Sequence, residues 1–277
     1  MTQRTVLITG ASSGMGAAAA RLFAARGWRV YGGARRETLI PTAPNITALH
    51  LDVTVHSDNV RFVSQVMTDQ PRIDVLINNA GYGEFGPLEE VPLSAVHQQL
   101  ATNLLGAADL TQLVIPIMRR QRSGRIVNIS SIAGDIYTPL GGWYYVSKHA
   151  LNVWSDTLDV ELRQFGLRSV VVAPGDTASS WSAIALQHAA ANLTTDSPYR
   201  GLLTAMQGVL TTGERVSGAT SADLATVFYR AATAPHPRRR YYHSPLDQFL
   251  THVARAHPTL YHQAMVAGTR FIMRHPH

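Results

Sequence analysis

The stretch TVLITGASSGMGAAAARLFAARG (5–27) decides the fold class of this chain. Its first part, TVLIT, is a β-branched apolar run that predicts a strand, and GMGAAAARLFAAR (14–26) is alanine-rich and predicts a helix. Gly10, Gly14 and Gly16 lie between and at the start of these elements. Glycines at a strand-to-helix turn let the backbone approach a ligand, and the helix N-terminus attracts an anion. The stretch therefore predicts a phosphate-binding turn, the alternative being an ordinary tight turn.

The same alternation of strands and helices continues along the chain. Further short apolar runs predict strands at 28–33, 46–52, 73–78, 125–130 and 168–173. Helical patterns are expected between them, at 57–69, 93–119 and 144–165, with Ser57 as a possible cap. Continuous apolar strands are typical of a parallel sheet covered on both faces. We expect an α/β fold with a doubly wound parallel sheet of the Rossmann type.

The rhythm changes after Asp176. Residues 176–220 have few strand signals and many small or polar residues, which predicts a substrate loop with short helices covering a site. Residues 221–277 predict a helix, a short strand near 240–242 and one or two amphipathic helices. We interpret this part as a helical C-terminal extension of a single domain that spans residues 1–277.

Composition and charge exclude several classes of protein. The chain has 277 residues, of which 45% are hydrophobic, so it can bury a full core, and no run of 18 apolar residues predicts a spanning helix. The absence of cysteine excludes disulfides and thiolate metal sites. The lack of cysteine, together with the absence of a signal peptide in MTQRTVLITG, favours a cytoplasmic location. The 12 histidines match no metal-binding spacing, so no metal is expected.

The formal net charge is +6, from 24 Lys and Arg against 18 Asp and Glu. Most of the positive charge is scattered, which favours a solvated surface, and nothing resembles a nucleic-acid-binding module. A membrane partner is not expected for the chain as a whole. A peripheral membrane contact through the basic, amphipathic segment 221–277 remains an alternative.

The end of the second predicted strand carries GGARRE (32–37). In dinucleotide-binding sheets, a carboxylate here accepts a bond from the 2′-hydroxyl of NAD, whereas arginine binds a 2′-phosphate. Arg35 and Arg36 precede the first acid, Glu37, so the sequence favours NADP(H). The alternative is that both arginines simply face solvent. Asp52, after the third predicted strand, could accept a bond from the adenine amino group or simply cap a turn.

A tyrosine and a lysine are spaced for acid–base chemistry. Lys148 is the chain's one lysine and follows Tyr144 by four residues, which places both on one face of the predicted helix. An ammonium near a phenol stabilises the phenolate and lowers the phenol's pKa toward neutral pH. Tyr145 lacks this spacing. We therefore predict Tyr144 as the general acid/base, with Lys148 as the group that activates it.

Seven motifs occur in one order: TGASSGMG (9–16), LDVT (51–54), NNAG (78–81), TNLLG (102–106), GRIVNISS (124–131), YYVSKHAL (144–151) and VVAPGDTAS (171–179). Together they resemble the short-chain dehydrogenase/reductase superfamily over residues 4–180. NNAGYGEFGPLEE and RYYHSPLDQFL are similar to the branch that contains hydroxysteroid and retinol dehydrogenases. The resemblance implies hydride transfer between a nicotinamide cofactor and a carbonyl or alcohol.

The resemblance also implies roles for single residues. Ser131 would polarise the substrate carbonyl, Asn103 would hold a water that links Lys148 to solvent, and Lys148 would also bind the nicotinamide ribose. Asn78 is expected to tie strands together instead of lining the cofactor. Ser179 holds a place that is often threonine in the family. The expected NADP(H)-binding residues are Gly10, Ser12, Ser13, Gly14, Met15, Gly16, Arg35, Arg36, Asp52, Val53, Asn79, Ala80, Gly81, Tyr144, Lys148, Pro174, Gly175 and Ser179.

Apolar and aromatic residues are candidates for the substrate wall: Tyr82, Phe85, Ile136, Leu140, Trp143, Trp181 and Ile184. They predict a hydrophobic ketone, aldehyde or secondary alcohol as substrate, although some of them could simply be core. The resemblance implies a homodimer or homotetramer paired through the helices at 93–119 and 144–165. A non-catalytic NADP(H)-binding sensor or regulatory relative is the alternative function.

Overall fold

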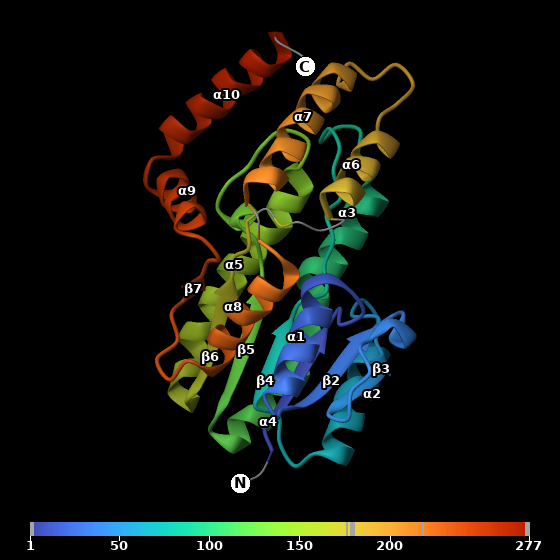
Figure 1. Cartoon of the computed structure of the whole chain (residues 1–277), viewed down its shortest axis with the longest axis vertical. Helices are drawn as coiled ribbons and strands as arrows, with labels where there is room; N and C mark the ends of the chain where they lie inside the picture. Colours follow the sequence, from blue (N-terminus) through green and yellow to red (C-terminus); the bar gives the residue numbers. More distant parts are fainter. Residues whose placement is uncertain (1–2, 176, 178–180, 218, 275–277) are drawn as a thin grey trace.

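The computed structural model describes residues 3–175, 177, 181–217 and 219–274, without the side chains of 181, 182 and 209–217. Its centre is a seven-stranded sheet of parallel strands in the order β3-β2-β1-β4-β5-β6-β7 (Figure 1). The strands are β1 Thr5–Thr9, β2 Arg29–Ala34, β3 Ile46–His50, β4 Val75–Asn78, β5 Gly124–Ile129, β6 Leu167–Val172 and β7 Arg240–Tyr241. The sheet confirms the predicted Rossmann-type architecture, because the strand order reverses at β1 and β4.

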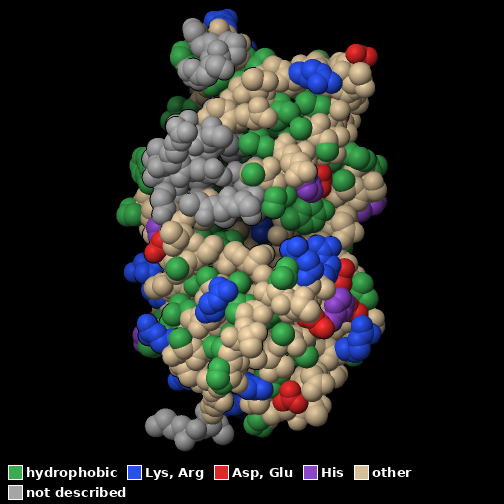
Figure 2. Space-filling model, turned by 45° about the vertical axis from the view of Figure 1, so that its right-hand side comes forward, with side chains coloured by type: hydrophobic (Ala, Val, Ile, Leu, Met, Phe, Trp, Pro, Cys, Tyr) green, Lys and Arg blue, Asp and Glu red, His purple; other side chains and the backbone are tan. Residues whose placement is uncertain are grey.

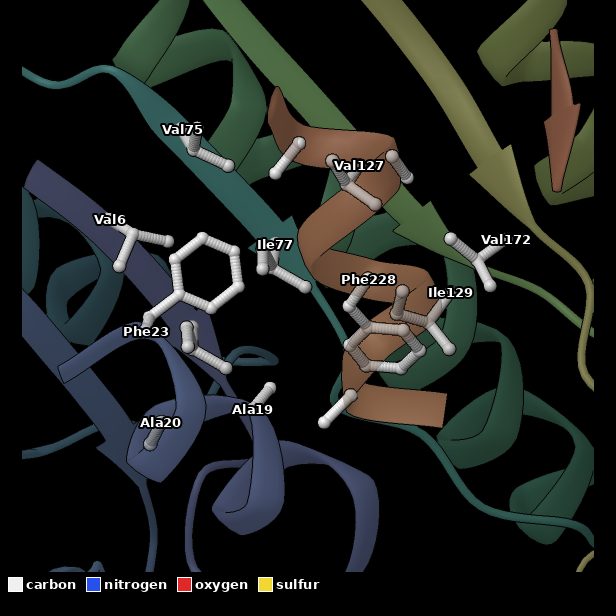
Figure 3. Close-up of a cluster of buried hydrophobic side chains, with 14 of the residues drawn as sticks. Val6, Ala19, Ala20, Phe23, Val75, Ile77, Val127, Ile129, Val172 and Phe228 are labelled. Carbon is white, nitrogen blue, oxygen red and sulfur yellow. The ribbon is translucent and has the colours of Figure 1, made fainter. Parts of the chain in front are cut away.

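Alternating side chains of the strands form two cores, one on each face of the sheet. Val6 and Ile8 point to the face covered by α1 (Gly14–Ala25) and α8 (Ser221–Thr233). Figure 3 shows Phe23 of α1 and Phe228 of α8 among the valines and isoleucines of the central strands. Leu7 points to the other face, which packs against α2 (His56–Asp69) and its neighbours. The glycine turn therefore lies at the carboxyl end of the central strand β1, in a sheet that helices cover on both faces.

The remaining helices follow the prediction with local differences. They are α3 Leu93–Leu100, α4 Gly106–Gln121, α5 Gly142–Leu162, α6 Trp181–Ala191, α7 Arg200–Ser217, α9 Pro245–Ala256 and α10 Pro258–Arg274. The expected single helix at 93–119 contains a π-helical turn, Ala101–Leu105, between α3 and α4. The cap predicted at Ser57 is wrong: α2 begins at His56, after Val55, whose side chain makes no capping bond. β3 is an edge strand and ends at His50, so Asp52 lies in the following turn.

The expectation of only short helices in 176–220 is wrong in one respect. α6 is short, with 11 residues, but α7 is an 18-residue helix. Its Leu203 and Met206 are buried in a cluster with Phe85 and Tyr144. Tertiary packing of these two side chains offsets the weak helix propensity of the glycines and threonines that predicted a loop. The C-terminal extension contains the predicted helix, short strand and two amphipathic helices as α8, β7, α9 and α10.

The run Leu93–Gln121 is long and apolar enough to cross a membrane by length and composition alone. Its polar residues argue against that assignment. Asn103 donates a hydrogen bond to Ser147 of α5, and Thr111 accepts one from Asn78 of β4. These bonds tie the run to the sheet and to α5.

Candidate active site

The glycine turn after β1 has the geometry of a ligand-binding turn. Gly10 has a φ of +66°, and a Cβ there would lie 3.0 Å from the Cα of Ala80. A Cβ on Gly16 would collide with the carbonyl of Gly10, which fixes the close approach of α1 to the turn. Gly14 has a φ of +51°, and a Cβ on it would meet nothing within 4 Å. The turn is therefore closely packed against the protein at Gly10 and Gly16, whereas the space beside Gly14 is open.

The start of α1 fits an anion. The side chain of Ser13, its N-cap, makes no capping bond, and the first turn contains no acidic residue. The positive end of the helix dipole is thus not balanced by the helix's own residues, which suits the phosphates of a dinucleotide. Ser12 and Met15 are half-buried beside it.

The segment after β4 is held against this turn by Thr9. The Thr9 hydroxyl accepts bonds from the backbone N–H groups of Asn79 and Ala80, both at 2.9 Å. Asn79 Nδ2 donates to the Thr9 carbonyl at 2.9 Å. Asn78 instead bonds Asn128 of β5 at 2.9 Å, which confirms its predicted role between strands. The sequence analysis missed Thr9, although a hydroxyl residue just before Gly10 was its signal.

Arg35 and Arg36 are exposed just beyond the carboxyl end of β2. The pKa of Tyr82 is raised to about 12, by burial first and then by Glu84, while Arg35 opposes this rise. The positive charge of Arg35 therefore acts on the hydroxyl of Tyr82, one of the substrate-wall candidates. Asp52 Oδ1 accepts bonds from the N–H and the hydroxyl of Thr54, at 3.0 and 2.8 Å, so Asp52 does cap a turn. Its bond to adenine stays a prediction, as does the cofactor contact of the buried neighbour Val53.

Tyr144 and Lys148 lie together on α5, one turn apart. Lys148 Nζ is 5.8 Å from the centroid of the Tyr144 ring, and both side chains are buried. Nζ donates to the carbonyl of Ile129 at 2.9 Å. Burial lowers the pKa of Lys148 to about 8, so the group still carries its proton at pH 7. A buried ammonium therefore faces the phenol ring, as the four-residue spacing predicted.

Asn103 lies in the π-helical turn and connects this turn to two other segments of the site. Its Nδ2 donates to the Tyr82 carbonyl at 2.9 Å and to Ser147 Oγ at 3.0 Å. Ser147 Oγ donates in turn to the Tyr144 carbonyl at 2.7 Å. A Cβ on Gly81 would lie 3.1 Å from Asn103 Oδ1 and 3.6 Å from Lys148 Nζ, so Asn103, Gly81 and Lys148 adjoin one another. The sequence missed Ser147, although it stands between the two catalytic candidates in YYVSKHAL.

Ser131 lies at the start of a 3-10 turn that follows β5. Its hydroxyl donates to the Pro174 carbonyl at 3.2 Å and accepts from the Ala133 N–H at 3.1 Å. These bonds bring Ser131 beside the Pro174–Gly175 segment, as expected for two parts of one site. Its predicted role requires a substrate oxygen to replace the Pro174 carbonyl as acceptor. Ser179 lies outside the described residues.

Apolar side chains adjoin Tyr144. The ring of Phe85 lies 5.7 Å from that of Tyr144, and Leu140 belongs to the same buried cluster. Leu140 has a φ of +67°, a strained conformation for a branched residue just before α5. Of the other wall candidates, Tyr82, Ile136 and Trp143 are half-buried and Ile184 is exposed. The side chain of Trp181 lies outside the described residues.

A polar cluster fastens α6 beside the site. The buried carboxylate of Glu84 bonds His188 Nδ1 at 2.9 Å and Asn192 Nδ2 at 2.7 Å. The imidazole of His188 also lies 5.9 Å from the ring of Tyr82. No local pattern indicates this cluster, because Glu84 is over 100 residues from His188 and Asn192. It ties the end of α6 to the segment that follows β4.

Comparisons with known proteins agree with this geometry. Residues 4–188 match the family model described as short chain dehydrogenase. A 3-ketodihydrosphingosine reductase from Bacteroides thetaiotaomicron is 39% identical over 176 residues, which cover 64% of this chain and 65% of that protein. The matched part thus spans just under two thirds of this relative.

Two solved structures are also similar. A short chain dehydrogenase/reductase from Burkholderia phymatum in complex with NAD has a TM-score of 0.80 at 24% identity, covering 93% of this chain and 95% of that one. A metagenomic short-chain oxidoreductase in complex with NADP has a TM-score of 0.67 at 26% identity, covering 86% and 96%. With the family model matching most of the chain, the protein belongs to the short-chain dehydrogenase family of oxidoreductases.

Proposed function

We propose that this protein is an NADP(H)-dependent oxidoreductase that interconverts a hydrophobic ketone or aldehyde and the corresponding alcohol. The observation that carries the proposal is the buried ammonium of Lys148, 5.8 Å from the Tyr144 ring centroid. A positive charge at this distance favours the phenolate and so makes the phenol a usable acid near neutral pH.

The turn at Gly10–Gly16 and the start of α1 would hold the phosphates of the cofactor, and Lys148 and Asn79–Gly81 would line its nicotinamide half. A bound nicotinamide supplies or accepts the hydride. Tyr144 would donate its hydroxyl proton to the substrate oxygen in reduction and take it back in oxidation. Ser131 would polarise the same oxygen, and Lys148 would stabilise the phenolate left on Tyr144.

The choice of NADP(H) over NAD(H) rests on Arg35 and Arg36. Two exposed guanidinium groups follow β2, and the first carboxylate comes after them, at Glu37. Guanidinium binds phosphate through paired hydrogen bonds, whereas a carboxylate would repel it. Similar solved structures contain NAD in one case and NADP in another, so the arginines are the specific support for NADP.

The substrate is proposed to be lipophilic. Tyr144 packs in a cluster whose other buried members are Phe85, Ala133, Leu140, Ala185, Ala189, Leu203 and Met206. These side chains favour an apolar body next to the reacting carbonyl. The name of the Bacteroides relative describes reduction of a keto group on a sphingoid lipid, which is consistent with this class.

The test is a spectrophotometric assay of NADPH consumption with a panel of lipophilic ketones and aldehydes. We expect turnover with at least some of them, and with secondary alcohols and NADP⁺ in the reverse direction. Tight NADPH binding without turnover across the panel would favour the alternative, a non-catalytic NADP(H)-binding sensor or regulatory relative.

We also propose that the chain forms a homodimer through α4 and α5. Val146, Val153 and Val160 of α5 are exposed and spaced by seven residues, so they form one apolar stripe. A second copy of the same surface would bury it.

A further inference from the structure

The net positive charge of the chain is concentrated at its C-terminal end. Residues 234–277 contain six arginines and one acidic residue, Asp247, which gives +5 of the formal +6. The face in Figure 2 instead shows basic and acidic side chains interspersed. The C-terminal segment is therefore a basic surface on a molecule that is otherwise almost neutral.

The helix α9 presents its apolar side to solvent. Thr251 and Ala254 face the protein and are buried. Leu246, Phe249 and Leu250 lie on the outer side, and Phe249 is 62% exposed. In a surface helix of a globular protein the apolar side normally faces the core. The reversed orientation needs a partner that the described residues do not supply.

The helix α10 also carries exposed apolar side chains. Tyr261 holds it to the body by donating to the Tyr137 carbonyl at 2.7 Å, and Ile272 packs against the cluster around Tyr144. No described residue of α10 is fully buried. On its outer side, Leu260 and Phe271 are exposed, Phe271 by 63%, and their spacing of 11 residues places them on one line. In Figure 1, α9 and α10 lie along one side of the molecule.

A basic groove adjoins the apolar side of α9. It has a volume of about 850 Å³ and includes Phe249 in its lining. The rest of the lining is mainly arginine, histidine and tyrosine from α8, from α9 and from residues 234–244 between them. Arg240 in this groove is neutralised by Asp156, through bonds of 2.6 and 2.7 Å. Arg238 and Arg239 are exposed at the rim, and Arg239 is 3.8 Å from the same carboxylate. Arg255, also in the lining, lies 3.5 Å from Asp135. Two carboxylates therefore face five lining arginines, which leaves the groove positively charged.

We propose that α9, α10 and the basic groove form a docking surface for an anionic lipid bilayer. Arginines at the rim would contact phosphate and carboxylate headgroups, and Phe249 and Phe271 would enter the boundary between headgroups and acyl chains. A symmetric contact with a second copy is disfavoured, because it would bring two surfaces of +5 together. The surface adjoins the site, since the Asp247 carboxylate of α9 contacts Gly175. A lipophilic substrate could therefore reach the site from the bilayer.

The test is co-sedimentation of the full-length protein with vesicles at low salt. We expect binding to vesicles of phosphatidylcholine with about 30% phosphatidylserine, and weak binding to phosphatidylcholine alone. The double variant Arg238→Glu/Arg239→Glu should weaken binding by at least about tenfold. Phe249→Ser/Phe271→Ser should also weaken it, whereas 0.5 M salt should affect mainly the arginine contribution.

Matched controls are Arg21→Glu on the exposed side of α1 and Val60→Ser on α2, which change the same kinds of side chain elsewhere. Retained NADPH binding and an unchanged thermal melt would show that the tail variants are folded. The proposal is overturned if the wild type stays in the supernatant with anionic vesicles, or if the tail and control variants behave alike. It is also overturned if light scattering shows that the two phenylalanines mediate self-association without lipid. Each readout is independent of catalytic turnover.

Discussion

Lys148 is a buried cation whose position in the chain has a clear chemical reason. Its side chain is 6% exposed, and burial lowers its pKa to about 8. Arginine would stay charged at any pH, but its planar, longer group could not donate to the Ile129 carbonyl in the same geometry. A lysine in this place combines a charge at neutral pH with a proton that can be lost.

The pH dependence of ketone reduction should report this ionisation. Below pH 8 the ammonium is present, and above it the proton is lost, so kcat/KM should fall through about pH 8. In Lys148→Arg the charge persists, and the remaining activity should lack this descending limb. The measurement is a pH–rate profile from pH 6 to about 10, which brackets the lysine pKa in the fold and in free peptides. An identical limb in the variant would assign the ionisation to another group.

A substitution of Arg35 tests the proposed preference for NADPH over NADH. Arg35→Asp should lower the preference for NADPH over NADH by about 10- to 100-fold, because a charge-assisted bond to phosphate is replaced by repulsion. Arg21→Glu, also exposed but on α1, is the control. The ratio of kcat/KM for the two cofactors measures the effect, and an unchanged ratio would count against binding of a 2′-phosphate by Arg35.

Residue spacing predicted some contacts and not others. The i, i+4 pair Tyr144 and Lys148 follows from helix geometry alone, so their adjacency could be predicted. The Glu84–His188 contact depends on how α6 packs, and no local pattern encodes that. Asp52 had two local interpretations, and the hydroxyl of Thr54 two residues later favours the turn cap.

At the scale of elements, a buried polar network joins the strands to the helices behind the site. Asn128 of β5 donates to Ser155 of α5 at 2.9 Å and to Ser169 of β6 at 3.2 Å, and accepts from Asn78. These bonds set the position of α5, and hence of Tyr144, relative to the sheet. A buried network is costly when one member is removed, because the remaining groups lose their partners.

Asn128→Ala should therefore destabilise the fold by about 2–4 kcal/mol. Unfolding in urea, followed by circular dichroism, measures the loss. Asn192→Ala, which removes bonds to Glu84 and to the Phe85 carbonyl outside the sheet, is the comparison. A loss at Asn128 no larger than that at Asn192 would show that the network does not hold the elements together.

Element boundaries were less predictable than element identities. β1 begins and ends where the apolar run does, because both of its faces are buried. The π-turn at Ala101–Leu105 has no sequence signature, since it depends on Asn103 meeting Tyr82 and Ser147 across the fold. The length of α7 was underestimated for a related reason. The burial of Leu203 and Met206 stabilises this helix, and that burial depends on packing against the cluster of Phe85 and Tyr144.

At the scale of the whole molecule, two apolar surfaces differ in charge. The valine stripe lies on α5, which contains one lysine and three acidic residues, whereas the outer sides of α9 and α10 lie in the segment with six arginines and one acidic residue. Charge therefore favours a second copy for the first surface and an anionic bilayer for the second. The sequence predicted the amphipathic tail, but the outward direction of its apolar side required the packing of Thr251 and Ala254.

Val153→Glu tests the proposed dimer. Val153 is 66% exposed, so the substitution should not disturb the monomer but would place like charges face to face across a symmetric contact. Multi-angle light scattering should show a dimer for the wild type and a monomer for the variant, with similar thermal melts. Equal masses for both would exclude this stripe as the interface.

The most direct test of the central claim is a comparison of Tyr144→Phe with Tyr145→Phe, two neighbouring tyrosines of which one faces Lys148. Turnover of a reactive ketone with NADPH and the affinity for NADPH would be measured for both. The account predicts that Tyr144→Phe loses about 10²- to 10⁴-fold in kcat while it binds NADPH nearly as well as the wild type, and that Tyr145→Phe keeps most of its activity. Full activity in Tyr144→Phe would contradict the account.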